Sequence, residues 1–160
     1  MPSKEENKND KLIYEIVVDR YNQEFKRTND LDSKASNVTG FAGLLATLSA
    51  GITEFFPQTN YEWLFLIPLT LFIGSAIIGL WAYWITSFVA INPVALIERY
   101  KDSTETKTLR AFTATTSQHT MYNASLNQKK VWRMYGAFIL LVLAIGLFFV
   151  FSIVNMANVR

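Results

Sequence analysis

Residues 28–56 read TNDLDSKASNVTGFAGLLATLSAGITEFF, and this stretch decides the fold. Its first part carries Asp30, Asp32 and Lys34, whereas no charged residue occurs over 38–53. Nothing between the two parts resembles a turn signal. The sequence therefore predicts that a charged helix continues directly into a membrane span.

Small residues recur at every fourth position of this stretch, and a spacing of four predicts one helix face. Such a face lets another helix backbone approach closely. Two interpretations stay open: close packing within or between subunits, or a central helix that lines a pore or moves. The row consists of Ala35, Thr39, Gly43, Thr47 and Gly51.

Composition indicates a membrane protein built as one folding unit. The chain has 160 residues, of which 51% are hydrophobic, and the charged residues gather outside three long apolar stretches. Each stretch approaches the ~20 residues that a bilayer requires. Cysteine is absent, which excludes disulfides and cysteine-based metal sites, and a net charge of +2 is too small to indicate nucleic-acid binding.

The predicted fold is an all-α membrane protein, with three transmembrane helices whose long extensions form a cytoplasmic helical stalk. Asn92-Pro93 is a helix start signal, and a further long helix is expected over 103–155. The predicted segments are a disordered tail (1–10), an amphipathic cytoplasmic helix (11–36) continuous with the first span (37–56), a second span (62–88), a cytoplasmic helical connection (89–133) and a third span (134–156).

Two stripes at helical spacing predict how the stalk is built. We expect them to pair along their length, and we expect oligomerisation to complete a stalk that buries little on its own. The first stripe is Tyr14, Val17, Val18, Tyr21, Phe25, Thr28 and Leu31, and the second is Leu109, Phe112, Thr116, His119, Tyr122 and Leu126.

The distribution of Lys and Arg predicts the orientation. These residues are abundant before the first span and over 89–133, absent from 57–62, and represented only by Arg160 after the third span. Because cytoplasmic loops carry the excess of Lys and Arg, the N-terminus is expected in the cytoplasm and the C-terminus outside the plasma membrane.

Charged residues at the predicted cytoplasmic boundary form a candidate site. They are either solvated or joined in a buried polar network, which would specify register more than it would stabilise. The candidates are Asp30, Asp32 and Lys34 on one helix and Lys129, Lys130 and Arg133 on the other.

No catalytic, metal or cofactor site is predicted. The single histidine, His119, has no Cys or acidic cluster near it in sequence, so we assign it a structural role. No phosphate loop, nucleophile elbow or carboxylate pair occurs, and we do not expect an enzyme.

A short pattern resembles a known family. Arg27, then Leu31-Asp32-Ser33-Lys34-Ala35 running into Gly40-Phe41, and a basic segment over 123–130 before the last span, resemble the small transmembrane effectors of Pycsar-type cyclic-nucleotide antiphage systems, or related three-span proteins of bacteria and archaea. The resemblance implies an oligomeric antiviral-defence effector that senses a cyclic nucleotide in the cytoplasm and perturbs the membrane.

Three classes of function remain from the sequence. The first is a signal-gated, channel-like effector, as the resemblance implies. The second is a passive membrane scaffold or a subunit of a larger membrane complex, because no charged residue lies at the bilayer centre of any predicted span and no catalytic set occurs. The third, a transporter, is disfavoured because three spans contain no obvious inverted repeat or polar site at mid-membrane depth.

Overall fold

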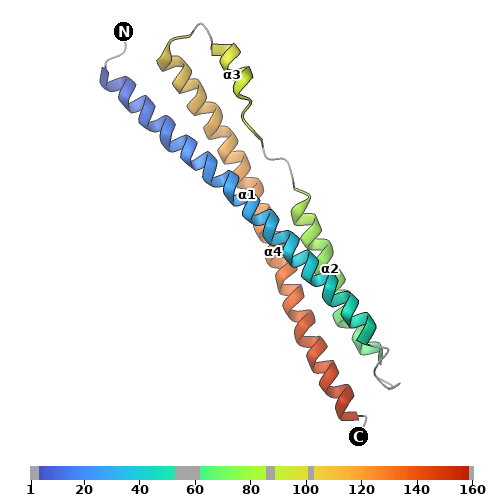
Figure 1. Cartoon of the computed structure of the whole chain (residues 1–160). Helices are drawn as coiled ribbons and strands as arrows, with labels where there is room; N and C mark the ends of the chain where they lie inside the picture. The colour runs from blue at the N-terminus through green and yellow to red at the C-terminus, as the bar shows by residue number, and fades with distance from the viewer. Residues whose placement is uncertain (1–3, 53–61, 86–88, 101–102, 159–160) are drawn as a thin grey trace. The chain divides into compact units, whose positions relative to one another are not determined.

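The chain forms helices throughout the residues that the structure describes. The computed structural model describes residues 4–52, 62–85, 89–100 and 103–158. Within these ranges there is no strand, which confirms the expected all-α fold. The elements are α1 (Lys4–Ile52), the 3₁₀ helix η2 (Glu62–Phe65), α2 (Leu66–Tyr83), α3 (Pro93–Tyr100) and α4 (Glu105–Asn158). Figure 1 labels α1, α2, α3 and α4.

Helix α1 is a single unbroken helix, as the absence of turn signals predicted. It begins at Lys4, so residues 4–10 are helical rather than a disordered tail. No Gly or Pro occurs over 4–39 to stop a helix that has started there. The predicted helix extends to Phe56, but residues 53–56 lie outside the described part of the chain.

Helix α2 is shorter than the predicted second span. It ends at Tyr83, and residues 86–88 of the predicted span lie outside the described residues. Pro68 lies in the first turn of α2, directly after η2. Amide groups in a first turn have no partner within the helix, so the missing N–H of proline costs no helical hydrogen bond there.

The connection after α2 contains a helix at the Asn92-Pro93 start signal and the beginning of the further long helix that the sequence predicts. The Asn92 side chain accepts a hydrogen bond from the backbone N–H of Ala95 at 3.3 Å, which confirms Asn92 as the cap of α3. Helix α4 then continues without a break from Glu105 to Asn158. It contains both the end of the predicted connection and the whole of the third predicted span.

Two compact units divide the chain. The first unit comprises Met1–Asp30 and Ser87–Gln128, and the second comprises Leu31–Thr86 and Lys129–Arg160. Helices α1 and α4 each contribute to both units.

In the first unit, α1 and α4 lie against each other in a parallel direction. Arg110 Nε donates to Asp10 Oδ2 at 3.0 Å, and the rings of Tyr14 and Phe112 meet edge to face with their centroids 6.1 Å apart. Farther along both helices, the Thr28 hydroxyl lies 3.0 Å from Asn127 Oδ1. Because the contacts follow the same order on both helices, α1 and α4 are paired in this unit, and the Tyr14–Phe112 contact joins the two predicted stripes.

In the second unit, α1, α2 and α4 share an apolar core. Its centre is Ala42, Phe72, Leu141 and Ala144, all buried. The small side chains bring the helix backbones close to the Phe72 ring, which fills the space between them.

The surface of the second unit is apolar. Two helices, Trp63–Tyr83 and Glu105–Ala157, are long and apolar enough to cross a membrane. Within the most apolar 18 residues of each helix, only 28% and 17% are buried. The core helix of a soluble protein is mostly buried, so these two helices differ from it. The exposed large side chains include Phe41, Leu44, Leu48, Ile73, Ile77, Phe138, Ile139, Leu143, Phe149, Val150 and Ile153.

Candidate functional site

A buried ion pair joins α1 and α4 in the second unit. Lys130 Nζ donates to Asp32 Oδ1 at 2.6 Å, and only 3% of the Lys130 side chain and 28% of the Asp32 side chain are exposed. A lysine is almost never this buried unless its charge is paired. The sequence left two interpretations of the charged boundary residues, solvation or a buried polar network. Asp32 and Lys130 fit the second, because they are bonded to each other and Lys130 is buried.

Arg133 makes a different set of contacts in the same unit. Its guanidinium lies over the Trp81 ring, 3.9 Å from the ring centroid, and its Nη1 donates to the backbone carbonyl of Trp81 at 3.2 Å. That carbonyl is in the last turn of α2, where carbonyl groups lack helical partners and attract cations. Arg133 thus ties α4 to the C-terminal end of α2.

The other boundary candidates do not join the network. Asp30, Lys34 and Lys129 are exposed. None of the three forms an ion pair within the described ranges. For these residues the solvated interpretation describes the structure.

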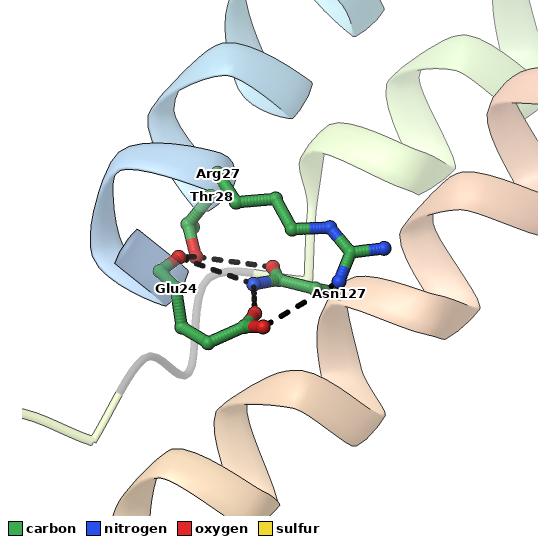
Figure 2. A network of polar contacts seen from close by, with 4 residues as sticks. All are labelled: Glu24, Arg27, Thr28 and Asn127. Carbon is green, nitrogen blue, oxygen red and sulfur yellow. Dashed lines mark hydrogen bonds and ion pairs between the residues drawn. The ribbon is translucent and has the colours of Figure 1, made fainter. Parts of the chain in front are cut away.

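A second polar cluster, the amide cluster, lies in the first unit and was not predicted. Figure 2 shows Asn127 of α4 facing Glu24 and Thr28 of α1. Asn127 Nδ2 donates to Glu24 Oε2 at 2.8 Å and to the Glu24 carbonyl at 3.2 Å. The Thr28 hydroxyl lies 2.9 Å from that carbonyl and 3.0 Å from Asn127 Oδ1. Arg27 lies 3.5 Å from Glu24 Oε1 at the exposed edge of the cluster.

Asn123, one helical turn before Asn127, fixes the chain segment that leads to α3. Its side chain accepts from the Val89 N–H at 3.0 Å and donates to the Val89 carbonyl at 3.3 Å. The Tyr21 hydroxyl donates to the same carbonyl at 3.4 Å and accepts from the Ile91 N–H at 3.3 Å. Side chains of α1 and α4 thereby supply hydrogen-bond partners to backbone groups of Val89 and Ile91, which lie outside any helix.

The predicted stripe on α4 shares Thr116 with the buried face but is displaced from it by one position at Tyr122 and Leu126. Tyr122 is 48% exposed and Leu126 is half-buried, whereas their neighbours Asn123 and Asn127 are 1% exposed. The sequence prediction followed apolar side chains, but the buried positions are occupied by amides. A repeat of seven (Thr116, Asn123, Lys130, Ala137, Ala144) is the sequence pattern that identifies this face.

The row of small residues on α1 does not stay on one face. Ala35 is buried, Thr39 and Gly43 are half-buried, and Thr47 and Gly51 are exposed. On a helix of 3.6 residues per turn, each step of four advances about 40° beyond a full turn, so Ala35 and Gly51 differ by about 160°. Four of the buried positions instead recur every seven residues, at Thr28, Ala35, Ala42 and Ser49, and Leu31 lies one turn after the first of them.

The buried polar atoms of α4 that lack hydrogen-bond partners within the described residues include Thr116 Oγ1 and His119 Nδ1. No group of three or more His, Cys, Asp or Glu side chains that could hold a metal ion occurs in the described part of the chain.

The amide cluster gives a direct stability prediction. Asn127→Ala removes the partner of Glu24 and Thr28, and we expect it to lower the free energy of unfolding by about 2 kcal/mol, because buried polar groups lose their hydrogen bonds. The measurement is denaturant or SDS titration in detergent, followed by circular dichroism. Asn29→Ala makes the same substitution at an exposed position of α1 and serves as the control. An equal loss in both variants would contradict a stabilising role for the cluster.

Comparisons with family models, curated proteins and solved structures gave no match to this chain. The fold and the polar contacts therefore define its class. Over its described residues it is an all-helical protein with two helices that are long and apolar enough to cross a membrane.

Proposed function

We propose that the chain is an oligomeric membrane protein of three spans that changes the bilayer in response to a cytoplasmic signal. The observation that carries the proposal is the continuity of α1 and α4. Each helix belongs both to a unit with charged surfaces and buried polar contacts and to a unit with an apolar surface. A change in the helix pair of the first unit has an unbroken backbone along which to reach the second.

The third span of the proposal is the end of α1. Residues 38–52 carry no charge, and Phe41, Leu44 and Leu48 expose about half of their surface. Such side chains suit lipid rather than water. The asymmetry of Lys and Arg supports an N-terminus in the cytoplasm, a C-terminus outside, and a plasma-membrane location.

The mode of action follows from which groups face outward in the second unit. No Asp, Glu, Lys or Arg occurs over 134–158, so a fixed ionic pathway through α4 has no charged residue to build on. On α1, Gly40, Thr47 and Gly51 are exposed, and a Cβ added at either glycine would have no neighbour within 4 Å. Small residues at such positions permit close packing between copies, and rearrangement of that packing would open an apolar, dewetting constriction.

The signal in this proposal is a cyclic nucleotide, and the role is antiviral defence. Support comes from the Pycsar-like pattern around Asp32 and Lys34. The Asp32–Lys130 pair lies within that pattern, which makes it the first place to look for a response to the signal.

The proposal predicts loss of membrane potential. Cells that express the chain are expected to depolarise when a cyclic pyrimidine nucleotide is supplied, as reported by a potential-sensitive dye. Purified protein in liposomes is expected to release a trapped dye under the same condition. An intact potential with every nucleotide tested, and also on overexpression, would refute a membrane-perturbing role.

A second candidate is a passive scaffold or subunit of a larger membrane complex, and one observation favours it. Leu12, Ile13 and Ile16 of α1 are 56%, 50% and 55% exposed in the first unit, where charged residues otherwise dominate the surface of α1. Exposed apolar clusters mark sites of protein interaction. Purification in mild detergent separates the two candidates, because a subunit retains a different protein in stoichiometric amount.

A further inference from the structure

The outer face of α4 in the first unit is unusual for a surface helix because it has no charge. Residues 111–128 contain no Asp, Glu, Lys or Arg. Over the same unit, the exposed positions of α1 include Lys8, Lys11, Glu15, Asp19 and Arg20. Solvated helix faces normally carry charges on the side away from their packing partner.

The exposed uncharged residues follow coiled-coil spacing. Ala114, Gln118, Met121, Ser125 and Gln128 are all exposed, and they are separated by alternating steps of four and three. This is the spacing of a seam between paired helices, and it is distinct from the buried seam through Asn123. The outer seam extends over about 21 Å of helix at 1.5 Å per residue.

We propose that this outer seam (Ala114, Gln118, Met121, Ser125 and Gln128) packs in parallel against the same seam of a second copy of the chain. The inference rests on the proposed function, because copies inserted in one membrane with one orientation are related by an axis along the membrane normal. Across such an axis each seam residue meets its own counterpart. Any charge on the seam would then meet a like charge, and a seam without charge avoids that repulsion.

The individual side chains suit contact with their own copies. The amides of Gln118 and Gln128 carry both donors and acceptors, so each can hydrogen-bond to its counterpart. The Ser125 hydroxyl already donates to the Tyr122 carbonyl at 2.7 Å, so covering it leaves no donor unsatisfied. Met121, 72% exposed, is flexible enough to fill the space between helices.

Other partners fit this surface poorly. Nucleic acid and anionic lipid headgroups are bound through Lys and Arg, which the seam lacks. A charged protein surface would lose hydration without gaining a partner charge. A seam of Ala, Gln and Ser is also too polar to be covered by lipid chains.

Disulfide crosslinking tests the proposal directly because the natural chain has no cysteine. Met121→Cys and Ser125→Cys, each as a single cysteine in native membranes, are expected to yield covalent dimers when oxidised with copper phenanthroline. A disulfide requires Cα atoms within about 7 Å of each other. Asn22→Cys, at an exposed position of α1 in the same unit, is the control and is expected to stay monomeric. Equal dimer yields at Asn22 and Met121, or none at the seam, would overturn the assignment.

Charge variants give a second test. Recovery of assembly by a mixed pair would show that each variant still folds, so a folding defect cannot be mistaken for loss of the interface. Met121→Glu is expected to shift the oligomer to monomer in mild detergent, and co-expression with Met121→Lys is expected to restore a mixed dimer. Failure of the mixed pair to assemble would count against the seam. Absent seam crosslinks with wild-type depolarisation intact would refute this surface alone, whereas seam crosslinks without any depolarisation would refute the proposed function alone.

Discussion

Asp32→Asn is expected to destabilise the second unit by about 3 kcal/mol, the lower end of the cost of removing one partner from a buried ion pair, because 28% of the Asp32 side chain is exposed. Lys130 would keep its charge in a site where only 3% of its side chain reaches solvent. The neutral amide of Asn offers an acceptor but not a compensating charge. SDS titration of purified protein in detergent, followed by circular dichroism, measures the loss.

Two further variants make this test specific. Asp30→Asn removes the same charge from the same helix at an exposed position, and it is expected to change the unfolding free energy by less than about 0.5 kcal/mol. The double variant Asp32→Leu with Lys130→Met replaces both charges with apolar groups, and it is expected to recover most of the stability. If Asp30→Asn and Asp32→Asn are equally mild, burial of the pair does not control stability.

The recovery expected of the double variant also bears on function. If Leu and Met can replace Asp32 and Lys130 without loss of stability, the ion pair is not needed for stability. Its role would then be to set the alignment of α1 with α4 or to respond to a signal. Under the proposed function, the double variant would then be stable but would respond differently to a nucleotide in the depolarisation assay. The same protein preparation therefore addresses stability and signalling separately.

The helical architecture followed from features that act locally. Residues 4–39 contain no Gly or Pro, so the helix that enters the apolar stretch had no place to stop. Asn92 and Pro93 marked the start of α3 in the same local way, and the Asn92 cap is present. Local rules predicted less well where two elements meet: the second span is predicted to begin at residue 62, but η2 occupies Glu62–Phe65 and α2 begins only at Leu66.

The polar contacts depended on register, which sequence spacing alone does not determine. Asp32 was identified as a network candidate, but three basic residues competed as its partner, and only the alignment of α1 with α4 selects Lys130. The amide cluster escaped prediction because the predicted stripe runs through Tyr122 and Leu126, one position before the buried Asn123 and Asn127. Its burial is possible because Glu24 and Thr28 supply hydrogen-bond partners, which are visible only once the helices are paired.

The second large effect is expected from Gly79→Leu in α2, with Gly79→Ala as the milder step. A Cβ added at Gly79 would collide with the Thr39 hydroxyl and would lie 3.6 Å from the Ala35 carbonyl oxygen of α1. Thr39 has two favoured χ1 rotamers in a helix, so its hydroxyl can leave the site only by a rotamer change, and its own Cβ remains 3.5 Å from the added atom. Overpacking of this kind costs about 1–3 kcal/mol for small additions, so we expect Gly79→Ala to fall in that range and Gly79→Leu to exceed it.

The contact between Gly79 and Thr39 allows a rescue experiment. It distinguishes steric crowding at this contact from other causes of lost stability. Gly74→Ala adds the same methyl group to the same helix, where its nearest neighbour would be Leu140 Cδ1 at an ordinary 3.7 Å, and it is expected to be tolerated. Thr39→Ala removes the colliding hydroxyl, which has no hydrogen-bond partner within the described residues, and combined with Gly79→Ala it is expected to restore wild-type stability. A double variant no more stable than Gly79→Ala alone would show that α1 and α2 do not meet at this glycine. Thr39 and Ala35 begin the row of small residues on α1. That result would therefore also show that the start of this row does not pack against α2 within one protomer.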